Sequence, residues 1–155
     1  MKAELLIKNI GMLATACGSA AKAGKEQGEI SIQENAWVAV EDGKILAVGT
    51  GETDVEAAEV IDAKGHLVTA GLVDAHTHLV FGGWRADELA LKLHGVPYLE
   101  ILANGGGILS TVRSTRAASE DELCDKTAAV LDEMLSLGTT TCEAKSGYGD
   151  RKSVV

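Results

Sequence analysis

One apolar run constrains the fold of this chain more than any other feature. Residues 67–81, LVTAGLVDAHTHLVF, are almost continuously apolar and contain two histidines one residue apart. Such a run is typical of a strand buried on both faces in a parallel sheet. We therefore expect a parallel sheet to begin here.

The residues after this run predict helices and then a second strand. Helical patterns occupy 85–93, 97–104 and 120–137, and 139–145 reads as a strand. The longest helix has clear ends, because Ser119 and Glu122 have the spacing of a capping box and Gly138 follows its last turn. Strand, helices and strand in this order predict a βαβ unit and an α/β domain.

The residues before the run are mostly β. In residues 36–49, two β-rich segments flank Asp42-Gly43, the dipeptide that favours a tight hairpin turn. Residues 58–68 read as a strand, a turn at Lys64-Gly65 and the start of another strand, whereas 18–29 read as a loop. The chain thus divides into a β segment, 1–68, and an α/β segment, 69–149.

The net charge and the cysteines of the chain indicate which partners and which cysteine-based sites are not expected. The 155 residues carry a formal net charge of -9, so we expect neither nucleic acid nor an anionic membrane as a partner. Three widely spaced cysteines, Cys17, Cys124 and Cys142, suggest neither a disulfide framework nor a metal clip. With no signal peptide or membrane span in the sequence, these features predict a cytoplasmic protein that acts on a small molecule.

His76 and His78 are the candidate metal ligands. Side chains two residues apart on a strand project from the same face, so two imidazoles can converge on one cation. The pair also leads into the Gly82-Gly83 loop at the end of the strand, where parallel α/β enzymes place their sites. The alternative is a pair of structural histidines. His66 and His94 carry no motif, and we interpret them as structural or exposed.

Three motifs in sequence order resemble the imidazolonepropionase family of the amidohydrolase superfamily. They are GLVDAHTHLVFGGWRADE, NGGGILSTVRSTRAASEDEL and EAKSGYG, and the resemblance covers residues 1–149. It implies a hydrolase that opens the ring of 4-imidazolone-5-propanoate to give N-formimidoyl-L-glutamate in histidine degradation. It also implies a (β/α)8 barrel beside a small β-sandwich, and one divalent ion, zinc or iron.

The resemblance also implies roles for individual residues. His76 and His78 match the first two metal ligands of the family, whereas its later histidine and aspartate ligands have no counterpart here. Arg85 and Tyr148 match residues that bind the substrate, and Tyr98 is a further candidate for the propionate carboxylate. The alternatives are a solvated arginine and surface or core-edge tyrosines, and we leave the role of Lys145 open.

The length of the chain predicts an incomplete protein. A (β/α)8 barrel needs about 250 residues, so the fold class that we expect is part of a β-sandwich followed by the first two βα units of an incomplete barrel. Residues 150–155, DRKSVV, leave the family pattern and match a sequencing adapter read as protein, so we expect a non-native tail.

Such a fragment is expected to be inactive, and a homodimer is left open for the complete enzyme. Two other functions are also left open. One is another amidohydrolase, such as a deaminase acting on a ring C–N bond, and the other is a non-catalytic β-rich binding module.

Overall fold

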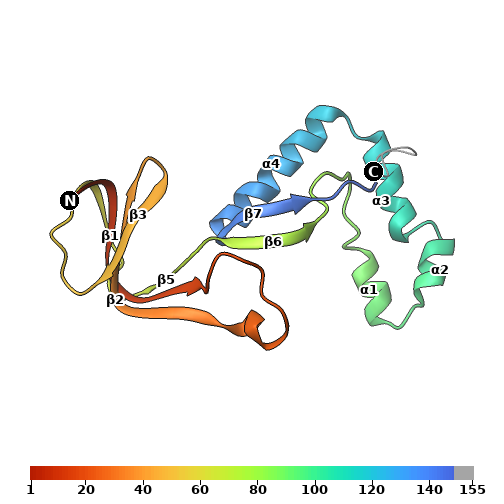
Figure 1. Ribbon diagram of the computed structural model, residues 1–155. Coiled ribbons are helices and arrows are strands. Elements are labelled where there is room, and N and C mark those ends of the chain that lie inside the picture. The colour runs from red at the N-terminus through yellow and green to blue at the C-terminus, as the bar shows by residue number, and fades with distance from the viewer. Residues whose placement is uncertain (149–155) are drawn as a thin grey trace. The chain divides into compact units, whose positions relative to one another are not determined.

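The computed structural model describes residues 1–148 and shows a mixed α/β chain (Figure 1). The chain forms two compact units, one spanning Met1–Ala70 and one beginning at Gly71. Among residues 1–148, the first unit contains the strands β1 to β5, and the second contains β6, β7 and the helices α1 to α4. The non-native tail predicted at 150–155 lies outside the described residues.

The first unit is one sheet with the strand order β3-β2-β1-β4, and β5 also pairs with β1. Its elements are β1 Lys2–Ala16, the 3-10 helix η1 Gly24–Gly28, β2 Ile30–Glu41, β3 Lys44–Thr50, β4 Glu56–Asp62 and β5 Leu67–Thr69. β2 is antiparallel to β1 and β3, whereas β4 and β5 run parallel to β1. Two clusters of buried side chains form its core: Ile10, Leu13, Ala36 and Val38, and Ala3, Leu6 and Ala39.

Both predicted turns of this unit are confirmed. Asp42 and Gly43 join β2 to β3 with φ angles of 51° and 67°, which match the positive values of a tight hairpin turn. Lys64 and Gly65 also have positive φ, and they separate β4 from β5. The positions of both turns could therefore be predicted from the residue types at the turns themselves.

The second unit contains the predicted βαβ arrangement. Its elements are β6 Leu72–Thr77, α1 Glu88–Leu93, α2 Tyr98–Ala103, α3 Gly107–Ala117, α4 Glu120–Ser136 and β7 Thr139–Ala144. β6 and β7 pair in parallel, and the four helices connect them (Figure 1). The capping box at the start of α4 is confirmed, since Ser119 and Glu122 bond each other's backbone N–H groups. No helix within residues 1–148 is long and apolar enough to cross a membrane.

Two expectations were wrong in detail. The apolar run 67–81 is divided between β5 and β6, and Leu72 and Val73 on β6 are 55% and 68% exposed. Among the described residues only β7 pairs with β6, so this strand is not covered on both faces. The helix α3 was not predicted, because its serines and threonines are poor helix formers in isolation.

Candidate active site

The histidine pair lies at the carboxyl end of β6. His76 belongs to the strand and His78 follows its last residue, Thr77. The two imidazole rings meet edge to face, with centroids 5.6 Å apart. The side chain of Asp74 accepts a hydrogen bond from the backbone N–H of His76 at 3.1 Å, which helps to fix this end of the strand.

His78 carries a buried nitrogen without a hydrogen-bond partner in the described part of the chain. That atom is Nδ1, and a Cβ placed on Gly147 would lie 3.4 Å from it. The Tyr148 ring lies next to the same imidazole, with centroids 5.0 Å apart. Since buried polar atoms are normally hydrogen-bonded, this unpaired imidazole nitrogen beside a second histidine is an exception within residues 1–148.

Helix α3 holds the loop that follows His78. The backbone N–H of Gly82 donates to Thr115 Oγ1 at 2.9 Å, and Thr115 in turn donates to the Thr111 carbonyl within the helix. A Cβ at position 82 would lie 2.5 Å from the Ser114 carbonyl oxygen. Only glycine permits this close approach of loop and helix.

Helix α4 holds the same loop through Lys126. Its ammonium donates to the carbonyl oxygens of Phe81 and Gly83 at 2.8 and 3.2 Å. The ammonium also lies 3.3 Å from the centroid of the Phe81 ring and 4.3 Å from that of Trp84. Burial lowers the pKa of Lys126. The contacts with the carbonyl oxygens and the aromatic rings offset the cost of burying this positive charge.

Replacing Gly82 by alanine is expected to lower the free energy of unfolding by about 1–3 kcal/mol, because the added methyl group must displace the loop or the helix. Urea unfolding of the purified protein measures the loss. Gly28→Ala is the matched control, since a Cβ there meets nothing within 4 Å. Equal stability of the two variants would contradict the close-approach argument.

The loop held in this way places Arg85 at a pocket that Tyr148 also lines. Both residues line an open pocket of about 340 Å³, together with Phe81, Gly83, Trp84, Ala86, Lys92 and Thr111. Its volume falls within the range of about 300–1,000 Å³ that is common for small-molecule sites. Because the Tyr148 ring also contacts His78, one side chain connects this pocket to the histidine pair.

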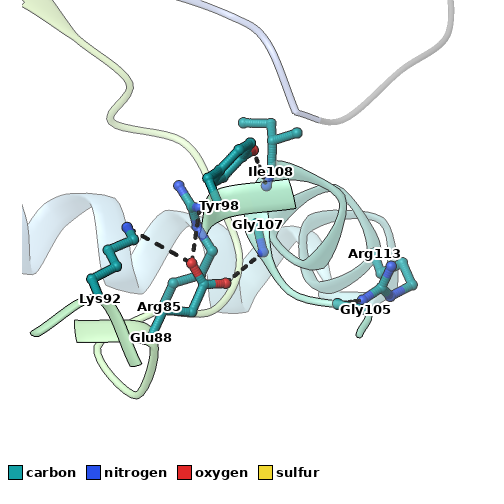
Figure 2. Close-up of polar contacts among 8 residues, drawn as sticks. All are labelled: Arg85, Glu88, Lys92, Tyr98, Gly105, Gly107, Ile108 and Arg113. Atoms are coloured by element: carbon teal, nitrogen blue, oxygen red, sulfur yellow. Dashed lines mark hydrogen bonds and ion pairs between the residues drawn. The ribbon is translucent and has the colours of Figure 1, made fainter. Parts of the chain in front are cut away.

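Tyr98 is not among the residues that line this pocket. It is 46% exposed, and its hydroxyl accepts a hydrogen bond from the backbone N–H of Ile108 at 3.4 Å (Figure 2). The structure therefore brings Arg85 and Tyr148 together and places the Tyr98 hydroxyl at the start of α3.

A second pocket, of about 360 Å³, has the opposite electrostatic character. The carboxylates of Asp87, Glu88 and Glu100 line it, and no cation among the described residues does. An anionic ligand is disfavoured there, whereas Arg85 and Lys92 favour one in the pocket beside Tyr148.

Glu88 is the site residue that the sequence analysis missed. It is 4% exposed, and its Oε1 accepts a hydrogen bond from the backbone N–H of Gly107 at 2.5 Å (Figure 2). Its Oε2 lies 3.4 Å from Arg85 Nη1 and 3.9 Å from Lys92 Nζ. The spacing of Arg85, Glu88 and Lys92, three and four residues apart, could have identified this network.

The remaining candidates take no part in these contacts. Lys145 pairs with Glu143 at 2.6 Å, and the hydrogen bond that it donates is the main cause that lowers the pKa of Glu143. His94 Nδ1 lies 2.7 Å from the Ala90 carbonyl oxygen at the end of α1, and His66 lies in the turn before β5. Within residues 1–148 no three His, Cys, Asp or Glu side chains gather closely enough to hold a metal ion.

Comparison with known proteins confirms the resemblance carried by the motifs. The imidazolonepropionase of Alkaliphilus metalliredigens is 52% identical over an alignment of 155 positions, and the match covers 96% of this chain and 37% of that protein. The imidazolonepropionase of Fusobacterium nucleatum is 53% identical over 153 residues, with the same two coverages. The chain thus spans little more than a third of the length of these curated relatives.

One solved structure shows a similar fold at lower sequence identity. A triazine hydrolase from Arthrobacter aurescens matches with a TM-score of 0.53 and 21% identity, over 94% of this chain and 30% of that one. No family model matches the chain.

Proposed function

We propose that this chain is part of an imidazolonepropionase, a metal-dependent enzyme that hydrolyses 4-imidazolone-5-propanoate to N-formimidoyl-L-glutamate in histidine degradation. The observation that carries the proposal is the contact of Tyr148 with His78, since it joins a metal-competent histidine pair to a pocket that contains Arg85. The identity of 52–53% to two imidazolonepropionases supports it.

The proposed architecture follows the same reasoning. Residues 1–68 are a segment of a β-sandwich, and residues 69–149 begin a (β/α)8 barrel with β6 and β7 as its first two strands. The parallel pairing of these strands around a helical connection supports this assignment. The fold similarity to the triazine hydrolase is compatible with it.

His76 and His78 are proposed to hold one divalent ion, zinc or iron. The unpartnered buried Nδ1 of His78 fits that role, because a neutral imidazole nitrogen is a good ligand for either metal. When bound, such an ion lowers the pKa of its water to about 7 and polarises the lactam carbonyl of the substrate. Both effects favour hydrolysis of a ring amide at neutral pH.

The residues of the adjoining pocket are proposed to bind the propionate group. The planar guanidinium of Arg85 suits a carboxylate, and the Tyr148 hydroxyl can add a hydrogen bond. Phe81 and Trp84 give the pocket apolar walls against which the rest of the substrate can pack. Tyr98 stays a prediction as a further contact for the same carboxylate, since it does not line this pocket.

The test is turnover by the complete protein that contains this segment. Purified with zinc or with iron, it is expected to convert 4-imidazolone-5-propanoate to N-formimidoyl-L-glutamate, which mass spectrometry identifies. The 155-residue chain alone is expected to give no product, because a catalytic zinc normally takes three protein ligands. Ammonia release without N-formimidoyl-L-glutamate would indicate a deaminase, and turnover by the short chain would contradict the need for further ligands.

A further inference from the structure

We infer that Glu88 is a positioning residue that fixes Arg85 at the edge of the substrate pocket. This inference rests on the proposed function, since it assigns Arg85 to the substrate carboxylate. It begins from a contrast in the structure. Glu88 is almost fully buried, whereas the two cations beside it line an open pocket.

The surroundings of Glu88 compensate its burial. A buried carboxylate is stable only when it is hydrogen-bonded and paired with cations. Glu88 Oε1 accepts from the Gly107 N–H at the start of α3, where backbone amides favour a negative charge. Its Oε2 faces Arg85 and Lys92, as Figure 2 shows. The carboxylate therefore connects α3 to both cations.

The glycines at the start of α3 let Glu88 reach this position. A Cβ on Gly106 would lie 2.9 Å from Glu88 Oε1, and Gly107 has a φ of 64°. Arg113 holds the turn on its other side by donating to the Gly105 carbonyl (Figure 2). The Gly107 N–H thus binds the Glu88 carboxylate. Through Glu88, this turn helps to fix the position of Arg85.

Arg85, Lys92 and Glu88 together carry one excess positive charge, which a bound anion would neutralise. Two cations face a single buried carboxylate, so one positive charge remains on the side of the pocket. The contact of Arg85 with Glu88 is made through Nη1 at 3.4 Å, and a guanidinium offers five N–H donors in a planar fork. Glu88 can therefore hold the Arg85 guanidinium through Nη1 while the remaining N–H groups bind a substrate carboxylate.

The experiment replaces Glu88 by glutamine in the complete, metal-loaded enzyme. Glutamine keeps an oxygen that can accept from the Gly107 N–H but removes the charge that faces Arg85. We expect KM to rise about 10-fold with kcat changed less than about 2-fold, because a misplaced binding group weakens substrate binding. Glu88→Asp is expected to recover part of the affinity. Glu100→Gln, an exposed carboxylate of the neighbouring pocket, is the matched control.

A double-mutant cycle with Arg85→Ala separates positioning from a structural role. If Glu88 acts through Arg85, then E88Q adds no further rise in KM to the Arg85→Ala variant. The effect of E88Q should also disappear with the amide of the substrate, which lacks the carboxylate. If E88Q instead damages the structure, KM should still rise in the Arg85→Ala background and with the amide of the substrate.

Other results overturn the inference. An unchanged or lowered KM for E88Q, or an additive cycle, would contradict it while leaving the proposed function intact. Failure of both E88Q and E88D to fold would assign Glu88 to stability alone. A wild-type enzyme without turnover would instead reject the proposed function itself.

Discussion

Replacing His78 by alanine in the complete protein is expected to lower kcat/KM at least about 100-fold and to remove the bound metal to a similar extent. The imidazole has a buried nitrogen without a partner among residues 1–148, and its ring adjoins that of His76. Loss of one ligand from such a site removes both affinity for the ion and the activated water. Elemental analysis of the purified variant, combined with turnover rates, measures the two effects.

The control for this experiment is His66→Ala. His66 is an exposed histidine of the first unit, in the turn before β5, so its loss tests whether removal of any histidine affects the metal content. That variant should keep both metal and turnover, and His76→Ala should behave like His78→Ala. Full metal content in His78→Ala would show that the unpaired nitrogen serves packing and is not a ligand.

Features decided by neighbouring residues could be predicted from the sequence. The Asp42-Gly43 turn depends on two residues that tolerate positive φ, and the capping box depends on Ser119 and Glu122 alone. In the same way, the spacing of His76 and His78 brought their rings to one side of the strand end. Each of these signals lies within a few residues, so no knowledge of the tertiary fold was needed.

Features decided by distant residues could not be predicted. Glu88 and Gly107 are 19 residues apart, and their contact exists only because α1 and α3 meet. The helix α3 likewise depends on packing, since the buried Thr111 and Thr115 line the side that receives the Gly82 loop. Such tertiary contacts outweigh the low helix propensity of these residue types.

The structure also explains why the apolar run 67–81 was interpreted as one buried strand. Apolar content predicts burial, but it does not say which segment supplies the cover. Here β5 completes the first sheet by pairing with β1, and β6 starts the second sheet with β7 as its partner in the described part of the chain. Leu72 and Val73 follow each other on β6 and so point to opposite faces, and both are exposed; in the proposed barrel one face would be covered by side chains of the barrel interior and the other by helices.

Replacing Arg85 by alanine is expected to raise KM for 4-imidazolone-5-propanoate up to about 100-fold, the loss that follows when a charge-assisted hydrogen bond to a carboxylate is removed. Lysine at the same position keeps the charge but loses the planar fork, so we expect Arg85→Lys to recover only part of the affinity. Steady-state kinetics of the complete enzyme measures both variants, and kcat should change much less than KM.

The same substitution elsewhere provides the control for this result. Arg116→Lys keeps the charge of an exposed arginine outside the Arg85 pocket, so KM should stay within about 2-fold of the wild-type value. The amide of the substrate supplies the second comparison, because without a carboxylate it gains little from Arg85 and should be hydrolysed with similar KM by wild type and Arg85→Ala. Equal losses for the acid and the amide would mean that Arg85 supports the loop and does not contact the propionate group.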